Sequence, residues 1–194
     1  MAANGDLDAF NQLVLNYQNL AFSHACILLG DTTLAEDATQ ESFIKAFRNI
    51  SRFLGGSFRA WIMRIVTNTA YDMLRWSKRH PIQSLFPQDE YGEEIEPAWL
   101  VDPAPSVQTI VEQHEFSKHI YKLLGELPDY YRVVITLVDM QALDYTEAAE
   151  VLGVPVGTVK SRLARARRQM RGKLLGDGYA QITGRGGEVS FSFC

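Results

Sequence analysis

A row of cationic side chains near the C-terminus has the spacing of a phosphate-binding helix. The segment 156–173 contains seven basic residues and no acidic residue. At 100° per residue its apolar side chains form one narrow stripe, made by Val159, Leu163, Ala166 and Met170. The opposite side carries Lys160, Ser161, Ala164, Arg165, Arg168 and Arg171. Such a helix can pack by its stripe and present its cations to phosphates and base edges, although an ordinary solvated basic face is the alternative.

A second set of side chains, within residues 58–79, combines cations with groups that stack on unpaired bases or hydrogen-bond to them. The helical period places eight of them in one arc of about a third of the circumference. They are Trp61, Arg64, Asn68, Tyr71, Asp72, Arg75, Lys78 and Arg79. Interleaved aromatic, amide and cationic groups suit single-stranded nucleic acid better than duplex. In the alternative, Trp61 belongs to the core and the arginines only face solvent.

A third set, within residues 33–50, is mostly acidic. One side of this predicted helix is apolar or small, and the other side carries Glu36, Asp37, Gln40, Glu41, Ile44, Lys45 and Arg48. Taken alone, this arc has the composition of an ordinary solvated face. Its function is left open by the residues themselves.

The elements that position the basic helix have the pattern of a helix-turn-helix. Asp144 followed by Glu147 is typical of a helix that starts with a capping box. Gly153 supplies the positive φ that ends a helix, and Pro155 lies at or near the first position of the next one. Pro155 offers no side-chain cap, so the first turn is expected to be capped by backbone only. A short helix, a glycine turn and a basic second helix predict binding in the major groove of DNA.

The rest of the pattern predicts an all-α protein. Apolar residues recur at helical spacing over 6–29, 33–50, 58–79, 107–124 and 129–140. A Thr33–Glu36 capping box is expected to open the second helix, and Ser57 is expected to cap the third. Residues 81–106 contain five of the seven prolines and resist regular packing. Two small helical domains, 1–80 and 107–176, are therefore expected on either side of an extended acidic linker, 81–106. The Gly-rich segment 177–194 is interpreted as a flexible tail or as a segment that orders on a partner.

Composition limits the class of protein. The net charge of the 194 residues is −4, but eight of the 23 acidic residues and none of the 19 basic ones lie between positions 80 and 117. The charge is thus segregated, and the remaining chain is cationic. Cys26 and Cys194 have no metal-ligand spacing and no secretory signal precedes them, which favours a reducing cytosol without a structural disulfide. No apolar run approaches the ~18 residues of a membrane span. A cytoplasmic protein without metal, cofactor or membrane insertion is expected.

Four segments in this order resemble the extracytoplasmic-function (ECF) sigma factors, the smallest sigma subunits of bacterial RNA polymerase. The resemblance runs from about residue 6 to 175. It is carried by AEDATQESFIKAFRNI (35–50), FRAWIMRIVTNTAYDMLRWSKR (58–79), LPDYYRVVITL (127–137) and VGTVKSRLARARRQMR (156–171). It implies sigma region 2 in the first domain and sigma region 4 in the second. It also implies a cytoplasmic specificity subunit with no catalytic site of its own.

The resemblance assigns a partner to each of the three faces. The acidic face would dock on the clamp helices of the largest subunit of core RNA polymerase, through Glu36, Asp37, Gln40, Glu41, Ile44 and Arg48. The third helix and the loop 53–57 would open and read the promoter -10 element, with Asn68 bonded to a flipped base and Trp61 bracing the melted junction. The last helix would read the duplex -35 element, with Lys160, Ser161, Ala164 and Arg165 on base edges and Thr158, Arg162, Arg168 and Arg171 on phosphates. An anti-sigma factor is an implied partner by resemblance alone.

Two other classes of protein remain as alternatives. A helix-turn-helix regulator could bind duplex operators without polymerase, but it needs neither the acidic face nor the Trp/Asn/Arg arc. A nucleic-acid enzyme could use Asp72 to hold a metal, but the sequence offers no second carboxylate at a fixed spacing to it. Initiation of transcription from a two-part promoter is therefore the expected function.

Overall fold

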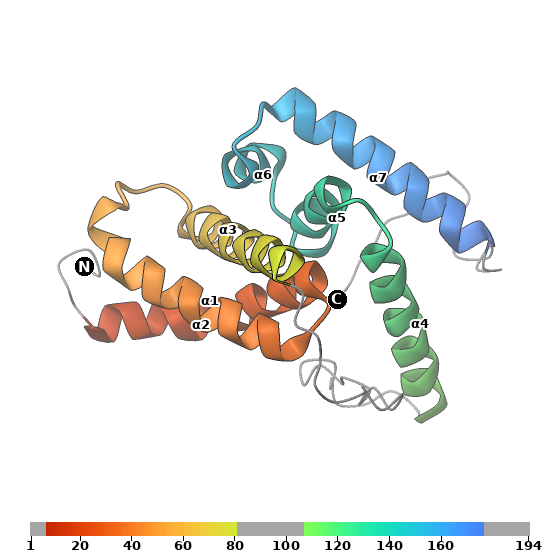
Figure 1. Cartoon of the computed structure of the whole chain (residues 1–194), viewed down its shortest axis with the longest axis horizontal. Coiled ribbons are helices and arrows are strands. Elements are labelled where there is room, and N and C mark those ends of the chain that lie inside the picture. The colour runs from red at the N-terminus through yellow and green to blue at the C-terminus, as the bar shows by residue number, and fades with distance from the viewer. Residues whose placement is uncertain (1–6, 81–106, 177–194) are drawn as a thin grey trace.

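The computed structural model describes residues 7–80 and 107–176, without the side chains of 107–115. Within these ranges the regular structure is all helix, with no strand (Figure 1). The predicted linker and tail lie outside the described residues. The α-helices are α1 (Leu7–Leu29), α2 (Thr32–Asn49), α3 (Phe58–Arg79), α4 (Val107–Gly125), α5 (Asp129–Ile135), α6 (Tyr145–Leu152) and α7 (Val156–Gly176). A 3-10 turn, η2 (Ile50–Arg52), and a π-helical turn, η4 (Thr136–Met140), complete the order. None of these helices is both long and apolar enough to cross a membrane.

Helices α1, α2 and α3 pack against one another as a bundle (Figure 1). The side of α2 that faces the bundle is rich in alanine, and Ala35, Ala38 and Ala46 are fully buried. Such small side chains let the helix axes approach closely, and larger residues of α3, among them Ile62 and Met63, fill the space between them. The opposite face of α2 is left to solvent. The positions that the helical period predicts for its apolar or small side are all buried: Ala35, Ala38, Ser42, Phe43, Ala46 and Ile50.

The N-terminal cap of α2 differs from the sequence prediction. Asp31, not Thr33, occupies the cap, and its carboxylate accepts a hydrogen bond of 2.8 Å from the Leu34 N–H. An Asp two residues earlier is an equally good acceptor, and it allows the helix to begin at Thr32. The Thr33–Glu36 capping box is therefore wrong. The expected Ser57 cap of α3 is confirmed, because its hydroxyl accepts from the Ala60 N–H at 3.2 Å.

Helices α5, α6 and α7 form a second packed unit, with α4 beside it (Figure 1). The predicted stripe of α7 is buried in full, at Val159, Leu163, Ala166 and Met170. Helix α6 begins with the predicted capping box between Asp144 and Glu147 and ends at Gly153, whose φ is 63°. This left-handed glycine turns the chain from α6 into α7 within a few residues, as a helix-turn-helix requires.

The single helix predicted over 129–140 is wrong in its second half. Helix α5 ends at Ile135 and the chain continues as the π-helical turn η4, in which the Gln141 N–H donates to the Thr136 carbonyl at 3.0 Å. The carboxylate of Asp139 on this turn is only 6% exposed and accepts two hydrogen bonds, of 2.6 and 2.9 Å, from Arg167 of α7. The wider turn thus supplies the carboxylate for a bidentate ion pair between η4 and α7.

A buried histidine in the bundle leads to a prediction about stability. His24 is fully buried between α1 and α3, its Nε2 lies 2.9 Å from the Thr67 hydroxyl, and burial lowers its pKa to about 3. The folded chain resists protonation, whereas the unfolded chain binds a proton near pH 6.5. Stability contributed by the neutral ring is therefore complete above pH 6.5 and is lost as the pH falls from there toward 3. Between pH 7 and pH 5 we expect a loss of about 2 kcal/mol.

Urea unfolding of the wild type and of His24→Met at both pH values measures this effect. The Met variant should lose about 2 kcal/mol less over that interval, because it has no proton to bind at this position. Equal losses in the two proteins would show that His24 does not control the acid sensitivity.

Candidate nucleic-acid interface

Helix α7 presents the face that the sequence predicts for duplex DNA. The side chains opposite the buried stripe that are exposed to solvent are Lys160, Ser161, Ala164, Arg165 and Arg168. The Thr158 N–H bonds to the Pro155 carbonyl at 2.8 Å, so a backbone carbonyl caps the first turn, as expected with a proline at this place. The residues assigned to base edges all lie on the exposed side of this helix in its first half.

Three side chains assigned to phosphates are only half-exposed: Thr158, Arg162 and Arg171. The Arg162 guanidinium lies 5.9 Å from the centre of the Tyr130 ring, and the Lys160 ammonium lies 5.5 Å from that of Tyr145. Rings of α5 and α6 thus hold two of the cations in place by cation–π attraction. Arg168 is the exposed member of the phosphate set.

Helix α3 carries the second predicted face, and most of it is open. Six of its eight predicted residues are exposed: Arg64, Asn68, Asp72, Arg75, Lys78 and Arg79. The Asp72 carboxylate pairs with Arg75 at 2.5 Å, and the Arg79 Nε donates to the Arg75 carbonyl at 3.2 Å. These local bonds align the cations along the helix. Both partners of the Asp72–Arg75 pair are more than 60% exposed, so the pair itself adds little to stability.

Trp61 belongs to an aromatic cluster at the start of α3. Its ring centre lies 5.3 Å from that of Phe53 and 5.5 Å from that of Phe58, and Phe58 in turn lies 5.3 Å from Tyr17. Trp61 is half-buried in this cluster, so it is neither a fully buried core residue nor a fully exposed one. The cluster fixes one edge of the indole and leaves part of it accessible beside the polar arc.

The loop before α3 exposes an apolar side chain that sequence reasoning overlooked. Leu54 is 96% exposed, directly after Phe53 of the aromatic cluster. Gly55 and Gly56 follow with φ of 102° and 93°, values that favour glycine and that lift this side chain away from the bundle. The signal in the sequence was an apolar residue next to a Gly-Gly pair.

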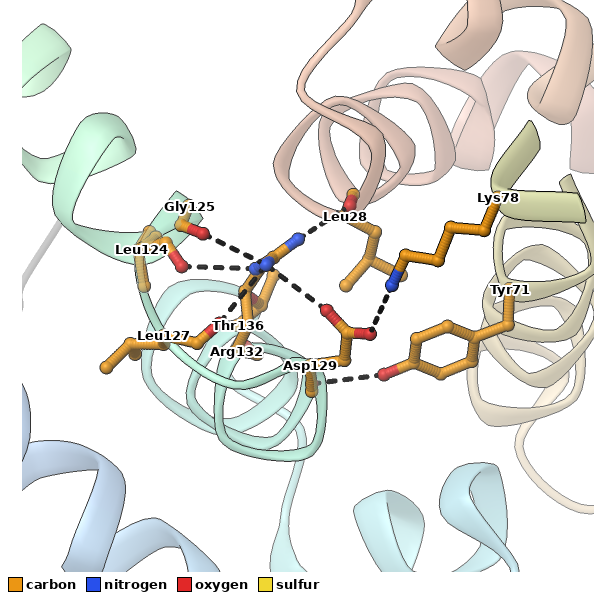
Figure 2. A network of polar contacts seen from close by, with 9 residues as sticks. All are labelled: Leu28, Tyr71, Lys78, Leu124, Gly125, Leu127, Asp129, Arg132 and Thr136. Atoms are coloured by element: carbon orange, nitrogen blue, oxygen red, sulfur yellow. Dashed lines mark hydrogen bonds and ion pairs between the residues drawn. The ribbon is translucent and has the colours of Figure 1, made fainter. Parts of the chain in front are cut away.

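Part of the α3 face touches the second unit of the chain (Figure 2). The Tyr71 hydroxyl donates to the Asp129 carbonyl at 3.1 Å, and the Lys78 ammonium lies 3.7 Å from the Asp129 carboxylate. Near the other end of α3, Arg64 donates to the Glu150 carbonyl of α6. Burial, with a smaller effect of Asp129, raises the pKa of Tyr71 to about 12, so its hydroxyl remains a donor at neutral pH.

Helix α2 presents the acidic face as an exposed surface on the bundle. All six residues assigned to polymerase docking are exposed: Glu36, Asp37, Gln40, Glu41, Ile44 and Arg48. Glu41 pairs with Lys45 of the next turn at 2.7 Å. Two further apolar side chains, Leu34 and Phe47, are each 39% exposed on the same helix and were not predicted. Exposed apolar side chains rimmed by polar ones occur at protein-docking surfaces, and Leu34, Ile44 and Phe47 make this helix a candidate for one.

The described residues offer little for catalytic or metal chemistry. No group of three or more His, Cys, Asp or Glu side chains within them could hold a metal ion. A cavity of about 500 Å³ lies where the end of α1 meets α4, lined in part by Phe22, Cys26 and Tyr121. Burial, reinforced by the charges of Glu36 and Asp31, raises the pKa of the Cys26 thiol to about 11. The thiol is therefore protonated at neutral pH and is a poor nucleophile.

Comparison with known proteins matches both packed units of this chain. Residues 13–80 match the family Sigma-70 region 2, and residues 118–170 match Sigma-70, region 4. The chain is 35% identical over 172 residues to ECF RNA polymerase sigma factor SigW of Bacillus subtilis, with 88% of this chain and 91% of that protein covered. The chain belongs to the ECF sigma factors. Another relative in the same family is SigE of Mycolicibacterium smegmatis, at 34% identity, of which the match covers 64%.

Two solved structures resemble this sigma factor over most of its length. RpoE of Bartonella quintana, solved with the anti-sigma factor NepR, superposes with a TM-score of 0.67 at 26% identity, covering 88% of this chain and 99% of that one. CnrH, solved with the cytosolic domain of CnrY, gives a TM-score of 0.65 at 27% identity over 91% of this chain and 94% of that one. In this sigma factor the region 2 match takes in most of α1 and all of α2 and α3. The region 4 match runs from the second half of α4 into α7.

Proposed function

We propose that this ECF sigma factor binds core RNA polymerase, recognises the -35 and -10 elements of a promoter, and melts the -10 region to start transcription. The observation that carries the proposal is the exposed polar arc of α3 on a chain that also has a helix-turn-helix. A protein that binds only duplex DNA needs a helix-turn-helix but does not need the polar arc of α3. The domain limits proposed from the sequence, 1–80 and 107–176 around the linker 81–106, separate these two functions.

Docking on polymerase is assigned to the exposed face of α2. Asp37, Glu41 and Ile44 lie along one side of this helix, which the resemblance to the family assigns to the clamp helices of the largest subunit. The acids supply electrostatic complementarity to a basic partner, while Ile44 and its apolar neighbours Leu34 and Phe47 supply area that is dehydrated on binding.

Melting of the -10 element is assigned to α3 and the loop before it. Capturing a flipped base requires a few kcal/mol of unstacking, which stacking on aromatic groups at ~1–3 kcal/mol per base can offset. Asn68 would hydrogen-bond the base, Trp61 and Leu54 would bound its pocket, and Arg75 and Arg79 would hold the backbone. The amide of Asn68 is exposed and stands among these cations on α3.

Reading of the -35 element is assigned to α7, and the division of labour along it can be tested. Arg165→Ala should weaken binding by ~1–3 kcal/mol at one base pair and relax the preference there. Arg168→Ala is chosen because Arg168 is the exposed phosphate candidate. It should weaken binding to all -35 sequences alike and lower the slope of log affinity against log salt concentration by about 1. Binding of the polymerase complex to a randomised -35 library at several salt concentrations measures both. Identical sequence profiles in the two variants would contradict the division.

The remaining properties follow from this assignment. The chain acts as a cytoplasmic specificity subunit and needs no cofactor, metal or catalytic site of its own, because the polymerase supplies the chemistry. An anti-sigma factor is proposed as a regulatory partner, since the similar sigma factor RpoE of Bartonella quintana was solved with such a partner.

Co-elution with core RNA polymerase in size-exclusion chromatography tests the proposal against the alternative of a polymerase-independent regulator. A sigma factor should co-elute at equimolar ratio and shift promoter duplex only in the presence of core. A chain that shifts a specific duplex tightly on its own and elutes apart from core would be a helix-turn-helix regulator instead.

A further inference from the structure

The start of α3 is joined to α6 of the second unit through a shared capping group. The Ser57 hydroxyl, which caps α3, donates to the Glu147 carboxylate at 2.6 Å. The other oxygen of Glu147 closes the capping box of α6 by accepting from the Asp144 N–H at 3.2 Å. One carboxylate thus links the first turns of two helices that lie 90 residues apart in the sequence. The adjacent bond from Arg64 to the Glu150 carbonyl adds a charged donor to the same contact.

The second half of α3 is joined to the start of α5. The Tyr71 hydroxyl donates to the backbone carbonyl of Asp129, and Lys78 lies near the carboxylate of the same residue (Figure 2). The Lys78–Asp129 pair is 72% and 44% exposed, so solvent screens it and its contribution is small. The neutral bond from the half-buried Tyr71 is the firmer of the two.

Arg132 joins α1 to the turn between α4 and α5. Its guanidinium is 13% exposed and donates to three carbonyls at the end of α4 and in the following turn, those of Leu124, Gly125 and Leu127 (Figure 2). Its Nη1 donates to a carbonyl in the last turn of α1, that of Leu28, at 2.9 Å. Helix C-termini carry partial negative charge. The cation therefore sits where the C-terminal ends of two helices from different domains converge.

We propose that these contacts are an interdomain latch that holds the free sigma factor closed and withholds part of its -10 face until polymerase opens the chain. The latch consists of the contacts Ser57–Glu147, Arg64–Glu150, Tyr71–Asp129, Lys78–Asp129 and Leu28–Arg132. The inference rests on the proposed function of α3. Three of the eight side chains assigned to the -10 element, Arg64, Tyr71 and Lys78, serve in the latch. Promoter DNA and region 4 therefore compete for the same groups.

Energy transfer between two dyes on the free full-length chain tests the latch. The dyes are attached through Ser51→Cys and Gln169→Cys, both exposed positions outside the assigned faces, with Cys26→Ala and Cys194→Ser to remove other thiols. Asp129→Lys places an ammonium beside Lys78 and Arg132 and should raise the ratio of open to closed chains about tenfold. Tyr71→Phe removes a single hydroxyl and should raise this ratio about threefold.

Glu126→Lys is the matched control. Glu126 has the same 44% exposure as Asp129, its change alters the net charge equally, and its partner Lys173 belongs to the same domain. This control should keep the high transfer of the unmutated chain. The latch is refuted if the unmutated chain already shows the low transfer of Asp129→Lys, or if Glu126→Lys and Asp129→Lys lower it alike.

A circular-dichroism spectrum checks that Asp129→Lys is folded. If this variant is unfolded, Tyr71→Phe is used in its place. Energy transfer in Tyr71→Phe equal to that of the unmutated chain would then contradict the latch. Neither polymerase nor DNA is present in these measurements. If the energy-transfer result contradicts the latch, the proposed binding to core polymerase is unaffected. If the chain does not co-elute with core, the energy-transfer result on the free chain still holds.

Discussion

The double charge reversal Asp37→Lys with Glu41→Lys should abolish co-elution of this chain with core RNA polymerase. Both side chains are exposed on α2, and the change turns an acidic face into a basic one. Like charges set against each other in an interface cost several kcal/mol, so affinity for core should fall more than a hundredfold. The fold should survive, because surface substitutions of this kind alter stability by roughly 0.5 kcal/mol each. The ion pair between Glu41 and Lys45, which this variant loses, is partly exposed, so its loss lowers stability by only about 0.3 kcal/mol.

A control variant separates the position of the charge from its sign. Glu126→Lys makes the same acid-to-base change at an exposed residue of region 4, whose partner Lys173 belongs to the same domain. Titration of labelled chain with core should give wild-type affinity for this control. Normal affinity in the Asp37/Glu41 variant, or equal losses in the two variants, would contradict the assignment of α2.

Asn68→Ala should leave polymerase docking and closed-complex formation nearly unchanged and should impair melting of the promoter. Asn68 is exposed on α3, apart from both the acidic face of α2 and the basic face of α7. Its amide is assigned to a base that becomes accessible only after unpairing. Loss of one or two such hydrogen bonds is worth on the order of 1–3 kcal/mol, about ten- to a hundredfold in the melting equilibrium. Permanganate footprinting of unpaired thymines measures that equilibrium.

A mismatched bubble across the -10 element should restore part of the loss, since it removes the cost of unpairing but not the missing contact. Asn19→Ala, an exposed asparagine on α1, is the matched control and should melt the promoter normally. If Asn68→Ala melts the matched promoter as well as wild type does, Asn68 has a structural function and α3 contacts DNA in another way.

Patterns local to one helix were predictable because a single periodicity decides them. The stripe of α7 from Val159 to Met170 is buried as expected, and the exposed basic side follows from it. The capping box at Asp144 and the left-handed Gly153 are equally local, since each depends on two or three neighbouring residues.

Choices between near-equal local solutions were not predictable. Asp31 and Thr33 are both good caps two residues apart, and residue type alone does not decide which of them begins the helix. The π-helical turn after Ile135 leaves no pattern of its own in the sequence. Its Asp139 pairs with Arg167 of α7, which is a tertiary contact that the local sequence does not reveal. The exposure of Leu54 likewise depends on the φ angles of Gly55 and Gly56, which the residue types alone do not fix.

Contacts between the domains could not be predicted from the sequence for a different reason. Arg132 and Arg64 donate to backbone carbonyls, those of Leu28 and Glu150, and a carbonyl is present at every residue. No residue type therefore marks the acceptor. The Ser57–Glu147 bond joins two residues whose capping functions were each predicted separately, and nothing local indicates that they meet.

Transcription by core polymerase reconstituted with this chain, on a library of randomised promoters, tests the central claim most directly. We expect transcripts that start at a fixed distance downstream of one shared -10 sequence. A shared -35 sequence should lie at a fixed spacing upstream of it. The transcripts should disappear when either element is scrambled. Transcripts that are equally abundant with core alone, or that depend on a duplex site without any -10 preference, would contradict it.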